Sequence, residues 1–331
     1  MEELPESAEP QHEKPLLTVE EQIAHLKSKG ITFDLCGEAE AATILAKQNN
    51  YLRITSYRQL FDRQTEGANV GAYINLDFGD LAALSSLDRK LRETFLALTV
   101  DVEHFAKMKV LASVEDHGED GYGIVSDFYA GLNHAGRNAI QGAMHARGGI
   151  GERHDAYAGD LIAHHLADMP VWVFLEVIDF GTFVNFYLFC ANRWEDNVML
   201  QEHYALKSVK ALRNATAHTH CIVHGFTKAL TGTAYDTPQV ITESLNGAAM
   251  PRTKTRRAKL GNVRIAQMAA SMYCLNALCD SEHALARHAS RLADLRSAYE
   301  ARIERYRLNS SLVSFFDFLF NLVDIWVPQQ R

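Results

Sequence analysis

The stretch from Asp80 to Leu111 constrains the fold most, because its apolar residues recur at intervals of three and four. This spacing places them on one face of an α-helix, so we predict a long core helix here. Few segments elsewhere alternate apolar and polar residues as a half-buried strand does, and the chain contains no internal repeat. The predicted fold class is therefore all-α. The residues of the apolar face are Leu84, Leu87, Leu91, Phe95, Leu98, Val102 and Phe105.

Residues typical of helix ends predict the neighbouring helices. Thr18 and Glu21 have the spacing of a capping box, and Gly30 ends the helix that they begin. Clustered Asp, Glu and Gly predict loops at 115–123 and 145–159, with a short helix between them. Further helices are expected over residues 38–48, 52–61, 169–190, 201–229 and 263–325.

The domain organisation follows from shifts in composition. Residues 1–13 are acidic and polar and lack the features of a signal or transit peptide, so we expect a disordered leader. One helical domain is expected over residues 14–230. Residues 231–260, rich in Thr, Gly, Pro and basic residues, are expected to form a basic loop. Residues 261–331 are expected to form a helical extension that packs on the same domain.

The composition favours a protein of the reducing cytoplasm. With 331 residues and 47% apolar content, the chain can bury a large core. The five cysteines are odd in number and form no CxxC pair, which argues against a disulfide framework and against a zinc knuckle. The longest apolar run is interrupted by Glu176, Asp179 and Asn185, so we expect a buried helix and no membrane span.

A formal net charge of −8 gives no general attraction to nucleic acid, so RNA binding would depend on local patches. The densest basic run extends from Arg252 to Lys259, and Arg53, Arg58 and Arg63 recur near Tyr51 and Tyr57. Solvated surface charge is the simpler interpretation of each patch. DNA binding is not expected. The candidate RNA-binding residues are Arg53, Arg58, Arg89, Arg252, Arg256 and Arg257.

One segment combines residue types suited to phosphodiester chemistry. Arg213, Asn214 and His218 lie within two helical turns. An arginine binds phosphate oxygens bidentately, and a histidine exchanges protons near neutral pH. The spacing alone is not specific, since Arg147 and His154 lie in a similar window, and an ordinary pair on a helix surface is the simpler interpretation from chemistry alone.

On an RNA substrate, the ribose 2′-hydroxyl could act as the nucleophile and leave a cyclic phosphate and a 5′-hydroxyl. The enzyme would then supply proton transfer and charge stabilisation, without a metal or another cofactor. This reaction needs a base and an acid. A symmetric homodimer that brings two copies of His218 together would provide both.

Resemblance over most of the chain adds to this interpretation. The sequence resembles the AbiD/AbiF-like abortive-infection family, and the likeness extends from about residue 14 to residue 225. It implies a HEPN-like helical bundle with a ribonuclease-like site at Arg213, Asn214 and His218, a role in phage defence or as a toxin, and a structured small RNA as a possible partner. After His218 the family pattern often continues with a second histidine and a nearby arginine, whereas this chain continues with Thr219, His220 and Cys221. The stretches that carry the likeness are 14–23, 50–54 with Tyr57, 87–92, 169–176 with 180–181, and 212–218.

Two glutamates and one further histidine are candidates for a supporting role at the site. Glu176 and Glu103 are the carboxylates expected to be buried and to orient Arg213 or His218, although a purely structural role is the simpler interpretation. His220 is a further candidate.

His220 and His224 would share a helix face four residues apart, which raises a zinc alternative, but no second cluster of ligands supports it. A non-catalytic RNA-binding module and a helical protein-interaction protein remain open as alternative functions.

Overall fold

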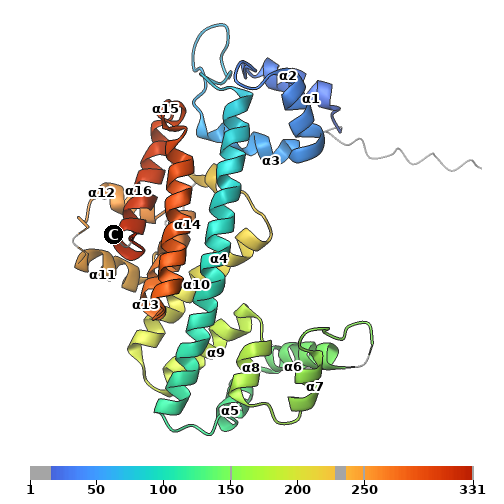
Figure 1. Ribbon diagram of the computed structural model, residues 1–331, viewed down its shortest axis with the longest axis vertical. Helices are drawn as coiled ribbons and strands as arrows, with labels where there is room; N and C mark the ends of the chain where they lie inside the picture. Colours follow the sequence, from blue (N-terminus) through green and yellow to red (C-terminus); the bar gives the residue numbers. More distant parts are fainter. Residues whose placement is uncertain (1–15, 150, 228–235, 249, 330–331) are drawn as a thin grey trace, which may run out of the picture. The chain divides into compact units, whose positions relative to one another are not determined.

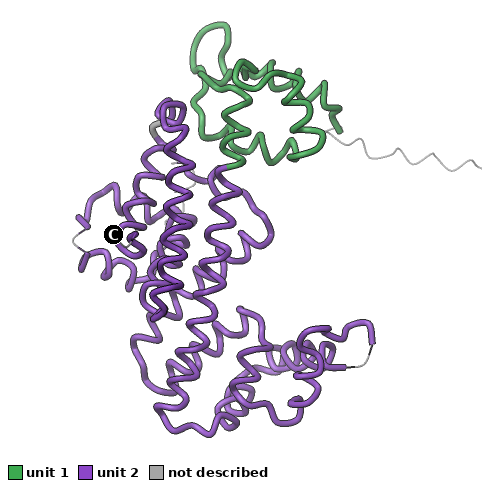
Figure 2. Tube along the Cα trace, viewed as in Figure 1, with its two compact units in different colours: residues 1–86 green, residues 87–331 purple. Residues whose placement is uncertain are grey.

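The computed structural model describes residues 16–149, 151–227, 236–248 and 250–329, and these are all-α (Figure 1). No strand occurs within these ranges, where β-pairing is limited to isolated bridges between Thr32 and Asp77 and between Arg63 and Tyr73. The predicted fold class is confirmed. The expected leader at residues 1–13 lies outside the described residues. The chain divides into two compact units, residues 1–86 and 87–331 (Figure 2).

Unit 1 begins with the predicted capping box. The Thr18 hydroxyl accepts the N–H of Glu21 at 3.2 Å, and the Glu21 carboxylate accepts the N–H of Thr18 at 2.7 Å. Helix α1 (Val19–Ser28) follows, and Gly30 continues the chain at φ +79°. The two helices expected next are each present in two pieces. They are α2 (Glu38–Thr43) with the π-helical η1 (Ile44–Gln48), and α3 (Tyr51–Ser56) with the 3₁₀-helical η2 (Tyr57–Leu60).

The predicted long core helix is α4 (Phe78–Asp116), which is continuous over 39 residues. It begins in unit 1 and continues into unit 2. Within unit 2, Asp101 of α4 accepts hydrogen bonds from Arg287 at 2.5 Å and His288 at 2.8 Å, both on α14 (Glu282–Glu300), which lies beside it (Figure 1). The apolar face points into the core as predicted, with Leu91, Phe95, Leu98 and Val102 fully buried.

The middle of unit 2 differs from the prediction in two places. Two helices, α5 (Gly123–Gly131) and α6 (His134–Gly148), replace the single short helix, so the second loop starts only after α6. The apolar run of 169–190 forms two helices, α8 (Val171–Val177) and α9 (Phe180–Arg193). The chain breaks there because the Asp179 side chain accepts the N–H groups of Gly181 at 2.7 Å and Thr182 at 3.0 Å and so starts a new helix. The short α7 (Gly159–His165) precedes α8.

The centre of unit 2 is α10 (Asn197–Ala217), which packs between α9 and α13 (Val263–Leu278). The 3₁₀ turn η3 (Val223–Gly225) follows α10. The predicted helical C-terminal region is confirmed as α13, α14, α15 (Ile303–Tyr306) and α16 (Ser310–Trp326), with α16 packed on α13 and α14. None of the helices in the described ranges has the length and apolarity needed to cross a bilayer.

The segment expected to be a basic loop contains two helices in its described part, so that prediction is wrong there. They are α11 (Gln239–Gly247) and α12 (Lys254–Leu260). Ile241 and Leu245 form a buried face on α11. The guanidinium of Arg256 donates to the carbonyls of Thr242 and Met250 at 2.8 Å and so ties α12 to α11. Local composition does not reveal these two helices, because the contacts that join them link residues up to 14 positions apart.

Candidate active site

Helix α10 ends in a turn that carries the predicted histidines. His218 caps the helix, Thr219 takes a left-handed conformation with φ +56°, and His220 follows. The N–H of Thr219 donates to the Thr216 carbonyl at 3.0 Å, and that of His220 donates to the Ala215 carbonyl at 2.9 Å. These two bonds define a Schellman motif, in which glycine usually takes the left-handed position. A β-branched residue in that position is strained.

The same end of α10 carries the predicted arginine and amide. Arg213 is half-buried, and Asn214 is exposed. The Arg213 guanidinium donates to the side-chain oxygen of Asn214 at 3.3 Å, and the N–H of His218 donates to the Asn214 carbonyl at 2.9 Å. The three predicted catalytic residues therefore lie together on the last turns of one helix.

Two imidazole rings stand next to each other beyond the helix end. His218 and His220 are both exposed, and their ring centroids are 6.1 Å apart. A histidine can give or take a proton near neutral pH. The turn at Thr219 thus displays two imidazole rings at the end of the helix that carries Arg213.

A buried carboxylate fixes the segment that follows the histidines. Asp88 of α4 has no exposed surface, and one of its oxygens accepts the N–H groups of Ile222 at 2.9 Å and Val223 at 2.8 Å. Its other oxygen pairs with the buried guanidinium of Arg92. A residue 134 positions away in sequence therefore anchors the backbone two residues after His220.

Helix α13 holds the same segment from another direction. Arg264 donates to the Ile222 carbonyl at 3.2 Å and contacts the His224 ring at 3.1 Å, while Asn262 donates to the Gly225 carbonyl at 2.8 Å. Burial lowers the pKa of Arg264, an effect that Asp88 opposes, and burial and Arg264 together lower the pKa of His224. A Cβ on Gly225 would lie 1.2 Å from the Arg264 guanidinium, so a side chain here would displace that group from its contacts.

The two glutamates predicted to support the site do not contact it in the structure. Glu176 on α8 is exposed, so its expected burial is wrong: it faces away from the apolar side of that helix. Glu103 on α4 is largely buried, but it pairs with Lys107 one turn away at 3.1 Å. One carboxylate that does contact the site segment is Asp88. In the sequence, Asp88 stands four residues before Arg92, and this spacing predicts an ion pair between them on one helix. The spacing does not predict the contacts of Asp88 with the backbone of Ile222 and Val223.

The candidate RNA-binding arginines are divided between the two units. Arg53 on α3 and Arg58 on η2 belong to unit 1, whereas Arg89 is exposed on α4 in unit 2. Arg252 and Arg257 are also exposed in unit 2. Arg256 is 4% exposed, and its hydrogen bonds hold α11 and α12 together, so it is a structural residue here.

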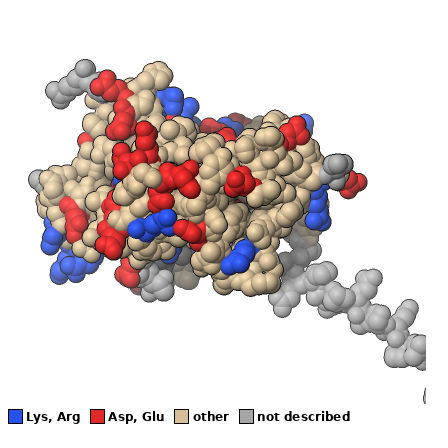
Figure 3. Space-filling model, turned by 90° about the horizontal axis from the view of Figure 1, so that it is seen from below, with Lys and Arg blue, Asp and Glu red and all other residues tan. Residues whose placement is uncertain are grey.

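The charge distribution matches the negative net charge. On the face drawn in Figure 3, Asp and Glu cover a larger visible area than Lys and Arg, whose side chains form small separate groups. This face offers no continuous basic track among its described residues. Contact of this face with an RNA backbone would therefore depend on local groups of cations.

The structure removes the basis of the zinc alternative. His220 and His224 were expected to share a helix face, but α10 ends at Ala217, so they stand in the following turn and in η3. Within the described ranges, no group of three or more His, Cys, Asp or Glu side chains is arranged to hold a metal ion.

Comparison with known proteins identifies the family of this all-α chain. A family model described as "Abi-like protein" matches residues 44–224, more than half of the 331 residues. The chain therefore belongs to the Abi-like protein family, which confirms the resemblance found in the sequence and supports a role in abortive-infection phage defence. The matched span includes Arg213, Asn214 and His218 and ends before α11. No curated protein and no solved structure gives a significant match.

Proposed function

We propose that this chain is a metal-independent endoribonuclease of the HEPN type that acts in abortive-infection phage defence or in a toxin–antitoxin system. One observation carries the proposal: Arg213, Asn214 and His218 lie together at the solvent-facing end of α10, and buried contacts of Asp88 fix the chain just after them. An active site needs such preorganised support.

The proposed reaction is transesterification within the RNA strand. A histidine removes the proton of a ribose 2′-hydroxyl, the 2′-oxygen attacks the adjacent phosphorus, and the bond from phosphorus to the 5′-oxygen breaks. A second acid protonates the leaving 5′-oxygen, so the products are a 2′,3′-cyclic phosphate and a 5′-hydroxyl, and no water is consumed. Arg213 stabilises the charge that develops on the phosphoryl oxygens, and Asn214 orients its guanidinium.

Two arrangements supply the base and the acid. His218 and His220 of one chain, with ring centroids 6.1 Å apart, could act on opposite sides of one phosphodiester. Alternatively, the two sites of a homodimer could face each other so that each copy provides one His218. The arrangements differ in their need for His220. A His220→Ala chain loses cleavage in the first arrangement and retains it in the second.

The test is cleavage of cellular RNA by purified protein in EDTA. We expect Arg213→Ala and His218→Ala to abolish cleavage, because each removes a reacting group while leaving the buried core intact. Lys207→Gln is the matched control, since Lys207 is an exposed cation on the same helix. Retained cleavage in the Arg213→Ala and His218→Ala proteins would refute the proposal.

The second candidate is a non-catalytic protein that binds a structured small RNA. It is favoured by the exposure of Arg89, Arg252 and Arg257, which could contact a folded RNA without any reacting group. It predicts that RNA copurifies with the wild-type and His218→Ala proteins alike, and that neither protein produces new RNA ends. The substitution Arg252→Gln with Arg257→Gln would weaken this binding.

A further inference from the structure

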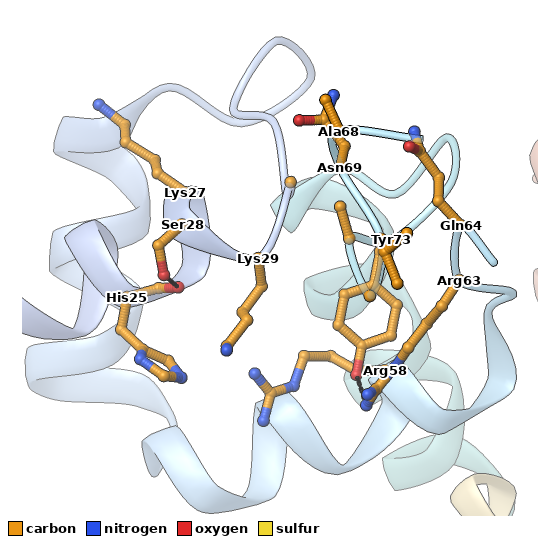
Figure 4. A pocket seen from close by; sticks show the side chains of 14 residues that line it. His25, Lys27, Ser28, Lys29, Arg58, Arg63, Gln64, Ala68, Asn69 and Tyr73 are labelled. Atoms are coloured by element: carbon orange, nitrogen blue, oxygen red, sulfur yellow. Dashed lines mark hydrogen bonds between the residues drawn. The ribbon is translucent and has the colours of Figure 1, made fainter. Parts of the chain in front are cut away.

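A basic pocket of about 680 Å³ lies within unit 1, and its lining residues differ from those of the candidate active site (Figure 4). Its walls are the end of α1 and the chain just after it, the 3₁₀ turn η2, and the loop of residues 63–73. The side chains on these walls include His25, Lys29, Arg58 and Arg63, and no aspartate or glutamate among the described residues lines the pocket. A volume of this size suits a ligand of about the size of a nucleotide, since small-molecule pockets enclose roughly 300 to 1,000 Å³.

Three cationic or protonatable groups converge inside this pocket. Lys29 and Arg58 point toward each other, and the ring of His25 lies beside them (Figure 4). Burial lowers the pKa of His25, and the charges of Lys29 and Arg58 lower it further. Among the described residues, no carboxylate pairs with the Lys29 ammonium. Like charges that face one another in a concave site repel, and a bound anion would relieve that repulsion.

The neighbouring Lys27, in contrast to Lys29, has an acidic partner among the described residues. Its ammonium pairs with Glu38 at 2.6 Å, and the side chain points away from the group formed by Lys29 and Arg58 (Figure 4). Lys27 is therefore neutralised by a carboxylate, whereas the described lining of the pocket offers Lys29 and Arg58 no acidic neighbour.

The pocket walls are held in place independently of a ligand. The N–H of Tyr73 donates to the Lys29 carbonyl at 2.9 Å, which joins the loop to the end of α1. Arg63 donates to the Tyr73 hydroxyl at 2.7 Å, and the guanidinium carbons of Arg63 and Arg58 lie 4.7 Å and 5.9 Å from the centre of the Tyr73 ring. Arg58 also donates to the Thr55 carbonyl at 3.0 Å. These contacts orient both arginines before binding, which reduces the entropy cost of recognition.

We propose that this pocket binds a phosphate group of a nucleotide-sized ligand, with Lys29 and Arg58 as its principal contacts. Guanidinium and ammonium groups together recognise phosphate oxygens through charge-assisted hydrogen bonds. Ser28, Gln64 and Asn69 line the same pocket and offer neutral polar groups to the rest of the ligand. The proposal is independent of the nuclease activity. Part of the site also precedes residue 44, where the family match begins, so it includes residues outside the matched span.

The test is titration of the full-length protein by calorimetry with two probes that present phosphate differently. One is ATP, and the other is a 2′-O-methyl oligonucleotide with a 5′-phosphate, compared with the same oligonucleotide carrying a 5′-hydroxyl. The 2′-O-methyl groups prevent cleavage by the proposed mechanism. We expect Lys29→Gln and Arg58→Gln each to weaken binding about tenfold or more, because charge-assisted hydrogen bonds are among the strongest polar contacts. Lys29 is exposed, so its variant keeps the fold.

Lys47→Gln is the matched control, since it removes an exposed cation of unit 1 that does not line the pocket. It should change binding by less than about twofold, as a screened surface charge does. Binding of ATP identifies a free nucleotide as the source of the phosphate, whereas selective binding of the 5′-phosphorylated strand identifies an RNA end. The proposal is overturned if neither probe binds, or if Lys47→Gln weakens binding as much as Lys29→Gln. The His218→Ala protein should bind the probes like the wild type, so a failure of the nuclease proposal would be seen separately.

Discussion

The substitution Asp88→Asn tests whether a buried carboxylate supports the candidate active site. Asp88 is fully buried, pairs with Arg92, and accepts the N–H groups of Ile222 and Val223 through one oxygen. An asparagine can keep that acceptor, but its amide group would then face the guanidinium of Arg92. The variant therefore leaves a buried cation without its counter-charge.

The expected cost is about 3 kcal/mol of unfolding free energy, at the lower end of the range for breaking a buried ion pair, because the two backbone hydrogen bonds can persist. Urea denaturation followed by tryptophan fluorescence measures this cost. The three tryptophans of the chain are Trp172, Trp194 and Trp326, all in unit 2, so the signal reports the unit that contains residue 88. We also expect RNA cleavage to fall, since the lost ion pair with Arg92 leaves the side chain that accepts the N–H groups of Ile222 and Val223 less firmly oriented.

Two further variants make the Asp88→Asn experiment specific. Asp116→Asn removes an exposed carboxylate from the same helix, and its unfolding free energy should match that of the wild type. Combining Asp88→Asn with Arg92→Met removes both charges, and the double variant should recover part of the lost stability. A loss below about 1 kcal/mol in Asp88→Asn would refute the assigned role, because an uncompensated buried charge costs more than that.

Three other substitutions have defined outcomes. Thr219→Gly should raise the urea midpoint of unit 2, with a gain of about 1 kcal/mol, because glycine takes φ +56° without the strain that a β-branched residue suffers. Gly225→Ala should lower that midpoint by an amount equivalent to about 1 to 3 kcal/mol and reduce cleavage, since its Cβ overlaps the guanidinium of Arg264. The hydrogen bond from Arg193 holds the pKa of Glu119 below its ordinary value of 4.5. The ionised carboxylate therefore stabilises the fold above that pH, and its contribution is lost as the pH falls through the lowered pKa. Glu119→Gln should accordingly reduce stability at pH 7 and flatten the decline below about pH 4.5, as followed by fluorescence across a pH series.

Local sequence patterns predict those parts of the fold that local interactions determine. The apolar spacing of α4 and the capping box at Thr18 each specify a helix through residues a few positions apart, and the structure confirms both. The break between α8 and α9 was also encoded locally. Asp179 has the side chain of an N-cap, but the apolar residues on both sides of it favoured one continuous helix.

Only those residues of the candidate site that lie close together in the sequence could be predicted from it. Arg213, Asn214 and His218 could be proposed as a group because they lie close together in the sequence. The end of α10 was missed, since Thr219 is an unusual residue for a left-handed position and does not signal a helix end as glycine would. The distant anchor Asp88 could not be assigned from spacing alone, because its partners at Ile222 and Val223 follow it by more than 130 residues.

The most direct test of the central claim is the terminal chemistry of RNA exposed to the purified protein in EDTA. We predict that wild-type protein produces new 5′-hydroxyl ends paired with 2′,3′-cyclic phosphates, and that the His218→Ala protein produces neither. RNA that remains intact with wild-type protein, or new ends that persist in the His218→Ala protein, would contradict the claim that the end of α10 is a ribonuclease site.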